Sequence, residues 1–263
     1  MSKDEQKLRV TIAGASGFVG GSLIKAAPEH WRIKALSRKD SLQGGESLFW
    51  RQADLFSLQS STAALAETDV AIYLVHSMLP STRLFQGNFA DVDLLIADNF
   101  ANACVKAGVK QIIYLGGLVP EKNISKHLAS RQEVEEVFKA TGIPCTILRA
   151  GMVAGNGGSS FEILRRLVTN LPAMILPRWT QMSTQVIHIE DLVRVLLAAV
   201  MNPEYFHQTI DVVNGEKLNY EKLIRMTACS LGKAPPLLHV PINSTAFSKL
   251  DRKSTRLNSS HGY

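Results

Sequence analysis

Short apolar runs alternate with longer stretches in which apolar residues recur every three or four positions. Runs of strand length begin at Val10, Trp31, Leu48, Asp69, Gln111 and Pro144. The clearest helical pattern lies between two of these runs, from Phe89 to Gly108. A strand followed by a helix, repeated along the chain, is typical of a parallel sheet covered on both faces. The pattern predicts an α/β fold with a doubly wound parallel sheet.

The regularity loosens after Ala150. Residues 151–158 are rich in glycine, a helical pattern spans Phe161 to Asn170, and residues 171–183 read as irregular. We therefore expect residues 1–155 to form the sheet core and residues 156–250 to form a small cap on its carboxyl edge. Residues 251–263 show no apolar period, and we interpret them as a non-native or disordered tail.

The first apolar run leads into a glycine motif. Glycines stand at positions 14, 17 and 20, and a helical pattern follows. A strand, a glycine turn and a helix form a dinucleotide site, because the turn lets the pyrophosphate approach the backbone at the helix N-terminus. The spacing is G-x-x-G-x-x-G rather than G-x-G-x-x-G, and a plain turn is the alternative. The residues assigned to this cofactor loop are Gly14, Ala15, Ser16, Gly17, Phe18, Val19 and Gly20.

The second strand pattern ends at Ser37 and Arg38, where a dinucleotide fold meets the adenosine ribose. An acidic residue there suits NAD, whereas an arginine suits the additional phosphate of NADP. Arg38 therefore predicts a preference for NADP(H), with NAD(H) remaining possible. The alternative is a solvated loop charge.

Two further groups of residues follow strand ends and are assigned to the cofactor. Asp54 and Leu55 follow the third strand pattern, where Asp54 would meet the adenine or cap the next helix. Leu74, Val75 and His76 follow the fourth, and ligands of open α/β sheets bind outside the carboxyl ends of strands. His76 is otherwise an ordinary polar loop residue.

Composition narrows the class of protein. The 263 residues are 46% hydrophobic, which is enough for a sizeable core. The net charge of +6 is scattered, so we expect no nucleic-acid partner. Three cysteines without metal or redox spacing indicate buried thiols in a reducing compartment. No apolar run reaches membrane-spanning length, and we expect a cytoplasmic protein.

Separate stretches resemble one family. The glycine loop and the segments 147–155, 188–193 and 211–220 resemble extended and atypical short-chain dehydrogenases/reductases. Residues 73–78, 114–118 and 127–134 resemble an atypical, NmrA-like and epimerase-like bacterial branch that is described as NAD(P)-binding. The resemblance covers residues 8 to about 240 and implies a Rossmann core with a substrate-side cap. Longer relatives carry a further C-terminal domain.

The chain departs from that family in its catalytic residues. The family uses a tyrosine and a lysine at Y-x-x-x-K, with a nearby hydroxyl side chain, to deliver a proton as hydride is transferred. No tyrosine in this sequence has a lysine at that spacing, and Gly116 and Gly117 stand where the hydroxyl is expected. The resemblance places His127 and Arg131 at the corresponding helix positions, one turn apart. We expect His127 to donate a proton and Arg131 to hold an oxyanion or the ribose; two surface side chains are the alternative.

Three functions remain open from the sequence. The first is an NADPH-dependent oxidoreductase acting on an unknown small molecule. The second is a non-catalytic NADP(H)-binding redox sensor that acts through a protein partner, and the third is an assembly factor stabilised by the nucleotide. Four residues of the cap are candidates to line a pocket for an apolar or acidic molecule: Phe161, Arg165, Arg178 and Trp179.

Overall fold

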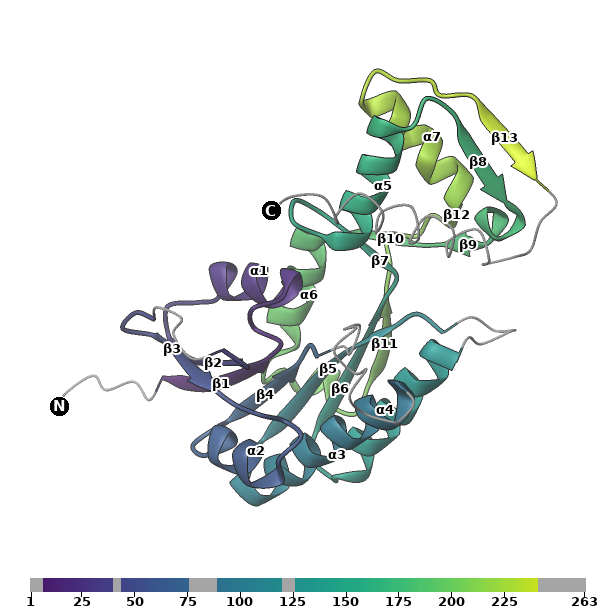
Figure 1. The fold of residues 1–263 in the computed structure, drawn as a ribbon. Coiled ribbons are helices and arrows are strands. Elements are labelled where there is room, and N and C mark those ends of the chain that lie inside the picture. The colour runs from purple at the N-terminus through teal and green to yellow at the C-terminus, as the bar shows by residue number, and fades with distance from the viewer. Residues whose placement is uncertain (1–6, 40–43, 76–88, 120–125, 241–263) are drawn as a thin grey trace, which may run out of the picture. The chain divides into compact units, whose positions relative to one another are not determined.

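A computed structural model describes residues 7–39, 44–75, 89–119 and 126–240 (Figure 1). Its central sheet has seven parallel strands in the order β3-β2-β1-β4-β5-β6-β11. Their bounds are β1 (Leu8–Ala13), β2 (Trp31–Ser37), β3 (Leu48–Gln52), β4 (Val70–Tyr73), β5 (Gln111–Gly117), β6 (Cys145–Ala150) and β11 (Thr209–Val212). The order reverses between β1 and β4, which makes their carboxyl ends the switch point where ligands bind. The predicted doubly wound parallel fold is confirmed.

Helices cover both faces of this sheet (Figure 1). Helices α1 (Phe18–Ala26) and α6 (Ile189–Ala199) cover one face, and α2 (Leu58–Leu65), α3 (Phe89–Ala107) and α4 (Lys126–Ala140) cover the other. Successive strand residues point to opposite faces and so belong to two hydrophobic cores. Ile12 and Ile113 lie in the first core, with α1 and α6, and Ala13 and Tyr114 lie in the second, with α2, α3 and α4. Burial on both faces explains why these strands read as nearly continuous apolar runs.

Four aromatic rings fix α3 and α4 on the sheet. The ring of Tyr73 lies 5.0 Å from the rings of both Phe100 and Phe138, and the ring of Tyr114 lies 5.4 Å from that of Phe138. All four side chains are almost completely buried. Aromatic contacts of this kind add to the free energy of burial, so the face of α4 that meets β5 is firmly set.

The chain divides into two compact units. The first comprises residues 1–158 and 186–214, and the second comprises residues 159–185 and 215–263. We expected residues 156–250 to form a single cap, but residues 186–214 group with the sheet. The reason is that β11 pairs with β6 and that α6 packs beside α1. A short parallel pair, β7 (Met152–Ala154) with β10 (Val186–His188), and the 3₁₀ helix η3 (Pro203–Tyr205) complete the first unit.

The second unit combines two helices with two small sheets. Its helices are α5 (Ser159–Asn170) and α7 (Tyr220–Ser230). Strand β8 (Met174–Pro177) pairs in parallel with β13 (Leu237–Val240), and β9 (Ser183–Thr184) pairs antiparallel with β12 (Leu218–Asn219). The segment 171–183, expected to be irregular, thus contains β8 and the 3₁₀ helix η2 (Arg178–Gln181). The tail assigned to residues 251–263 lies outside the described residues.

Within the described ranges, no helix combines the length and the apolar character needed to cross a membrane.

Candidate functional site

The glycine loop lies at the switch point, between β1 and α1. Gly14 has φ +83, a conformation that favours glycine, and a Cβ atom there would lie 2.8 Å from the carbonyl oxygen of Leu74 on the neighbouring strand. The N–H of Gly17 donates to the carbonyl of Gly14 over 3.0 Å and closes the turn. Position 14 therefore requires glycine for its torsion angle and for the close approach of the two strands.

Helix α1 begins without a capping side chain. Its N-cap is Gly17, no side chain accepts from the first turn, and that turn contains no acidic residue. The first N–H groups of a helix have no partner within the helix, and they lie at its positive end. A Cβ atom on Gly17 would meet only the Gly14 carbonyl, at 3.1 Å. The backbone in front of α1 is therefore open to an anion such as a pyrophosphate.

The third glycine of the motif brings the helix onto the strand. A Cβ atom on Gly20 would lie 2.4 Å from the carbonyl oxygen of Gly14. Ala15 is buried in the first core, whereas Ser16 is exposed beside Gly17. Phe18 and Val19 pack against the same core. The exposed part of this loop is therefore Ser16 and Gly17, whereas Ala15 is part of the core.

A second glycine segment packs against the start of α1. A Cβ atom on Gly158 would lie 2.9 Å from the ring of Phe18, and one on Gly155 would lie 3.1 Å from it. Gly155 also has φ +157 and would contact Ile189 at 2.5 Å. These glycines let the loop that follows β7 close over Phe18, which holds the first turn of α1 in place.

The end of β2 presents Arg38 to solvent. Ser37 is buried, and its hydroxyl accepts the N–H of Lys39 over 3.1 Å. The carbonyl of Arg38 is held by the side-chain amide of Gln52 at 3.1 Å. The guanidinium of Arg38 is exposed and forms no salt bridge with a carboxylate of the described residues. The backbone of Arg38 is thus fixed while its charge stays available.

The loop after β3 is held from α3. The side-chain amide of Asn99 donates to the carbonyls of Leu55 and Phe56, at 3.1 and 2.8 Å. The carboxylate of Asp54 accepts the N–H of Phe56 over 3.0 Å, and the cap of α2 is Ser57. Asp54 therefore does not cap the helix; it shapes the turn before it.

The end of β4 lies next to the glycine loop. The N–H of Leu74 donates to the carbonyl of Ala13 over 2.9 Å. Leu74 is buried and Val75 is half-buried. The neighbouring candidate His76 lies outside the described residues.

At the end of β5 two glycines make room for charged side chains of α4. A Cβ atom on Gly117 would lie 2.7 Å from Nη1 of Arg131, and one on Gly116 would lie 3.2 Å from the carboxylate of Glu135. Arg131 therefore lies against the strand end where the family carries a hydroxyl. His127 is one turn earlier on α4, and its side chain lies outside the described part of the structure.

Arg131 is held in surroundings with little water. Its Nε atom is buried and has no hydrogen-bond partner among the described residues. Burial lowers the pKa of the guanidinium, and the nearby Tyr114 and Asp93 act in the opposite direction. Burial also raises the pKa of the Tyr114 hydroxyl. A partly desolvated cation with an unused donor is suited to stabilise a negative charge.

One ion pair of this site was not predicted from the sequence. Glu135 is 1% exposed and binds Arg149 of β6 through two bonds, of 2.9 and 2.6 Å. This hydrogen bonding raises the pKa of Arg149. A signal was present, because positions 127, 131 and 135 recur every four residues and so share one face of a helix. The pair fixes the turn of α4 that follows Arg131.

Among the described residues, no three His, Cys, Asp or Glu side chains lie close enough together to hold a metal ion.

Comparisons with known proteins agree with this geometry. A model of the NmrA-like family matches residues 6–255. A ceramide reductase of Caulobacter vibrioides is 26% identical over 239 residues, which are 88% of this chain and 73% of that protein. The auxiliary protein GraX of Staphylococcus aureus is 27% identical over 113 residues, 42% of this chain and 37% of that protein.

Solved structures share the fold. MoeE5 in complex with UDP-glucuronic acid and NAD has a TM-score of 0.71 at 20% identity, over 89% of this chain and 85% of that one. The resemblance to atypical short-chain dehydrogenases/reductases is confirmed. By the match that spans most of its length, the chain belongs to the NmrA-like family.

Proposed function

We propose that the chain is an NAD(P)(H)-binding oxidoreductase of the short-chain dehydrogenase/reductase type that acts on a small molecule. The observation that carries the proposal is the uncapped N-terminus of α1, which lies at the switch point behind a glycine turn. The residues fit a dinucleotide: Gly17 leaves the helix end open, and Gly14 and Gly20 keep strand and helix close enough to present it.

The exposed Arg38 supports a preference for NADP(H). Its guanidinium lies at the end of β2 and has no carboxylate partner among the described residues. A planar fork of donors binds a phosphate through two hydrogen bonds, whereas an unphosphorylated ribose offers no charge for it. In this account Ser37 and Asp54 shape the neighbouring turns and bring the loop to the adenosine end.

A bound nicotinamide dinucleotide would supply or accept a hydride. In the proposed reaction His127 donates or takes the proton at the substrate oxygen. Arg131 stabilises negative charge on that oxygen or holds the ribose, and the lack of a side chain at Gly117 gives it the room to do so. These roles replace the tyrosine and lysine of the wider family.

The second candidate function is a redox sensor that binds NADP(H) without turnover and acts through a protein partner. Two observations favour it. The sequence contains no Y-x-x-x-K pair, and the relative GraX is named as an auxiliary protein. Both candidates require cofactor binding at α1, and they differ in turnover.

Calorimetric titration with NADPH and NADH tests the cofactor assignment. We expect wild type to bind NADPH more tightly. Arg38→Asp should lose about 1.5–3 kcal/mol of NADPH affinity, the range of a charge-assisted contact, and change little with NADH. Lys106→Asp is the matched control, because it reverses an exposed charge at the other end of the sheet. Equal affinities in wild type would contradict the preference for NADP(H).

A further inference from the structure

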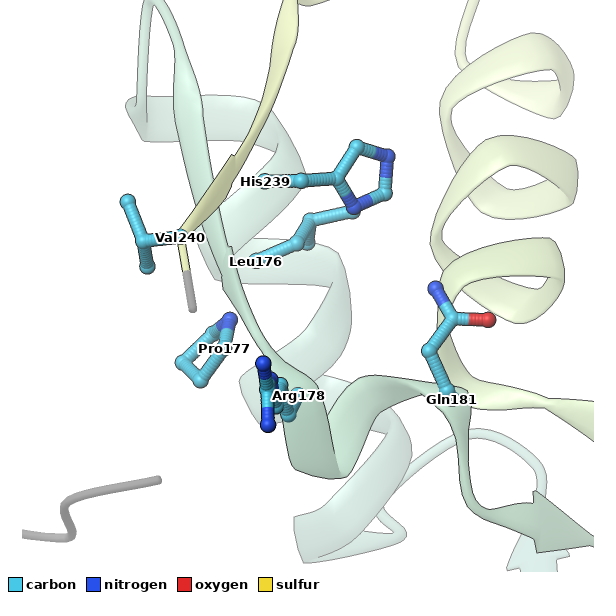
Figure 2. Close-up of a pocket in the computed structure, with 6 residues that line it drawn as sticks. All are labelled: Leu176, Pro177, Arg178, Gln181, His239 and Val240. Carbon is cyan, nitrogen blue, oxygen red and sulfur yellow. The ribbon is translucent and has the colours of Figure 1, made fainter. Parts of the chain in front are cut away.

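The second unit contains a pocket of its own (Figure 2). Its volume is about 310 Å³, near the lower end of the roughly 300–1,000 Å³ of small-molecule sites. Strands β8 and β13 and the 3₁₀ helix η2 supply the six residues that line it: Leu176, Pro177, Arg178, Gln181, His239 and Val240. One part of this lining is apolar and the other is polar.

The apolar part comes from the two paired strands. Pro177 of β8 and Val240 of β13 are register partners, as are Leu176 and His239. Leu176 is 2% exposed, while Pro177 and Val240 are half-buried. An apolar body of a ligand would therefore gain burial against a wall that is already in place.

Two polar side chains of the pocket are positioned by α7. The amide of Gln181 donates to Glu221 at 2.6 Å and accepts from Asn219 at 3.2 Å. The Nε2 atom of His239 lies 3.6 Å from the other oxygen of Glu221. Glu221 is itself bound by Arg225 at 2.8 Å, and this contact contributes most to lowering the pKa of Glu221. The negative charge next to the pocket is thus already paired.

Arg178 brings an uncompensated positive charge to the same pocket. It is exposed and forms no salt bridge with any carboxylate in the described part of the chain. Arg165, in the same unit, differs, because Glu162 holds it through two bonds of 2.8 Å. Figure 2 shows Arg178 at the end of β8, with Pro177 and Val240 to its left and Gln181 and His239 to its right. A guanidinium in this position suits a planar carboxylate or a phosphate.

We propose that this pocket binds a small amphipathic anion. Its apolar body lies against Pro177 and Val240, and its carboxylate or phosphate group binds Arg178. Gln181 and His239 line the pocket on the other side of Arg178, where Glu221 and Asn219 position them. The proposal rests on the second unit alone and does not depend on the proposed oxidoreductase function.

Binding of simple amphiphiles to the full chain tests this proposal. Calorimetry below the micellar concentration compares decyl phosphate and decanoate with decanol and decyltrimethylammonium. We expect at least one of the two anions to bind saturably and more tightly than the alcohol and the cation; the tighter anion identifies the head group. Arg178→Gln should weaken its binding by about ten- to a hundredfold, the range of a charge-assisted contact.

Two further variants test whether anion binding depends on this pocket rather than on the overall charge of the protein. Arg165→Gln removes the same charge in the same unit outside the pocket, and it should bind the anion as wild type does. Val240→Thr keeps the shape of the apolar wall. It should reduce the increase in affinity that wild type shows when the octyl chain of the anion is lengthened to decyl. No saturable anion binding, or equal binding by wild type and Arg178→Gln, would overturn the proposal. Titration of NADPH in parallel reports separately on the cofactor site.

Discussion

The guanidinium of Arg131 takes the space that any side chain at position 117 would need. Its Nε atom is buried and has no partner in the described part of the chain, and burial lowers the pKa of the guanidinium. Such a group gains more from a bound anion than an exposed arginine does, because less water competes for it. At the scale of single residues, the Gly117–Arg131 contact is therefore the best support for chemistry at the end of β5.

Substitution of the two α4 residues tests that chemistry. His127→Ala should lower turnover at least a hundredfold, the lower end of the effect of a positioned general acid, and leave NADPH affinity nearly unchanged. Arg131→Ala should lower both turnover and NADPH affinity. Lys139→Ala changes an exposed residue of the same helix and should lower neither. The assay is NADPH oxidation with a panel of aldehydes, ketones, quinones and enones. Turnover by His127→Ala at the wild-type rate would contradict its role, and no turnover by wild type would favour the sensor.

Single residues differed in how well the sequence predicted them. The roles of the glycines at 14, 17 and 20 could be predicted because each depends on local geometry: the turn, the start of the helix, or the packing of the helix on the strand. The Glu135–Arg149 pair was missed because it joins a helix to a strand, and the spacing that places Glu135 on the face of Arg131 does not identify a partner on β6. The role of Asp54 was left open between an adenine contact and a helix cap, and the cap of α2 is Ser57.

At the scale of elements, the alternation of short runs and helical patterns predicted the core strands well. The third predicted strand begins at Leu48, as β3 does, and α3 begins at Phe89 as expected. The pattern failed where a strand depends on a distant partner. Strand β8 pairs with β13, about sixty residues later. Local periodicity contains no information on such pairings, so residues 171–183 looked irregular.

The Glu135–Arg149 pair links α4 to β6, and a substitution measures how strongly. Glu135→Gln keeps the shape but leaves a guanidinium without its counter-charge, so we expect the free energy of unfolding to fall by about 1–3 kcal/mol. Glu136→Gln is the matched control, because the carboxylate of Glu136 is exposed and its removal should have little effect on stability. Urea denaturation of the two variants provides the comparison. Equal stabilities would show that the pair does not hold α4.

At the scale of the whole molecule, Asp69 ties three strands together at the amino edge of the sheet. It accepts from the N–H and the guanidinium of Arg9 on β1, at 3.1, 2.9 and 3.0 Å, and pairs with Lys110 before β5 at 3.1 Å. The hydrogen bond from the Arg9 side chain is the main reason that the pKa of Asp69 lies well below its ordinary range. Because the pKa is lower in the folded chain, this stabilisation is present at neutral pH and is lost as the pH falls below about 4.

Asp69→Asn should therefore lower the free energy of unfolding at pH 7 by about 1–3 kcal/mol and flatten its decline in acid. The measurement is urea denaturation at several pH values between 7 and 3. Asp191→Asn serves as the control, since Asp191 pairs with Arg194 on an exposed surface. If the free energy of unfolding of Asp69→Asn fell as steeply with decreasing pH as that of wild type, this account would be contradicted.

The central claim is that the open N-terminus of α1 binds the pyrophosphate of a nicotinamide dinucleotide. Calorimetric titration of NADPH into wild type, Gly17→Val and Gly21→Val tests it most directly. A side chain at position 17 would fill the space in front of the helix, whereas a Cβ atom on Gly21 has nothing within 4 Å. We expect Gly17→Val to lose NADPH binding while its circular dichroism stays near wild type, and Gly21→Val to retain binding. NADPH binding by Gly17→Val at wild-type affinity would contradict the site.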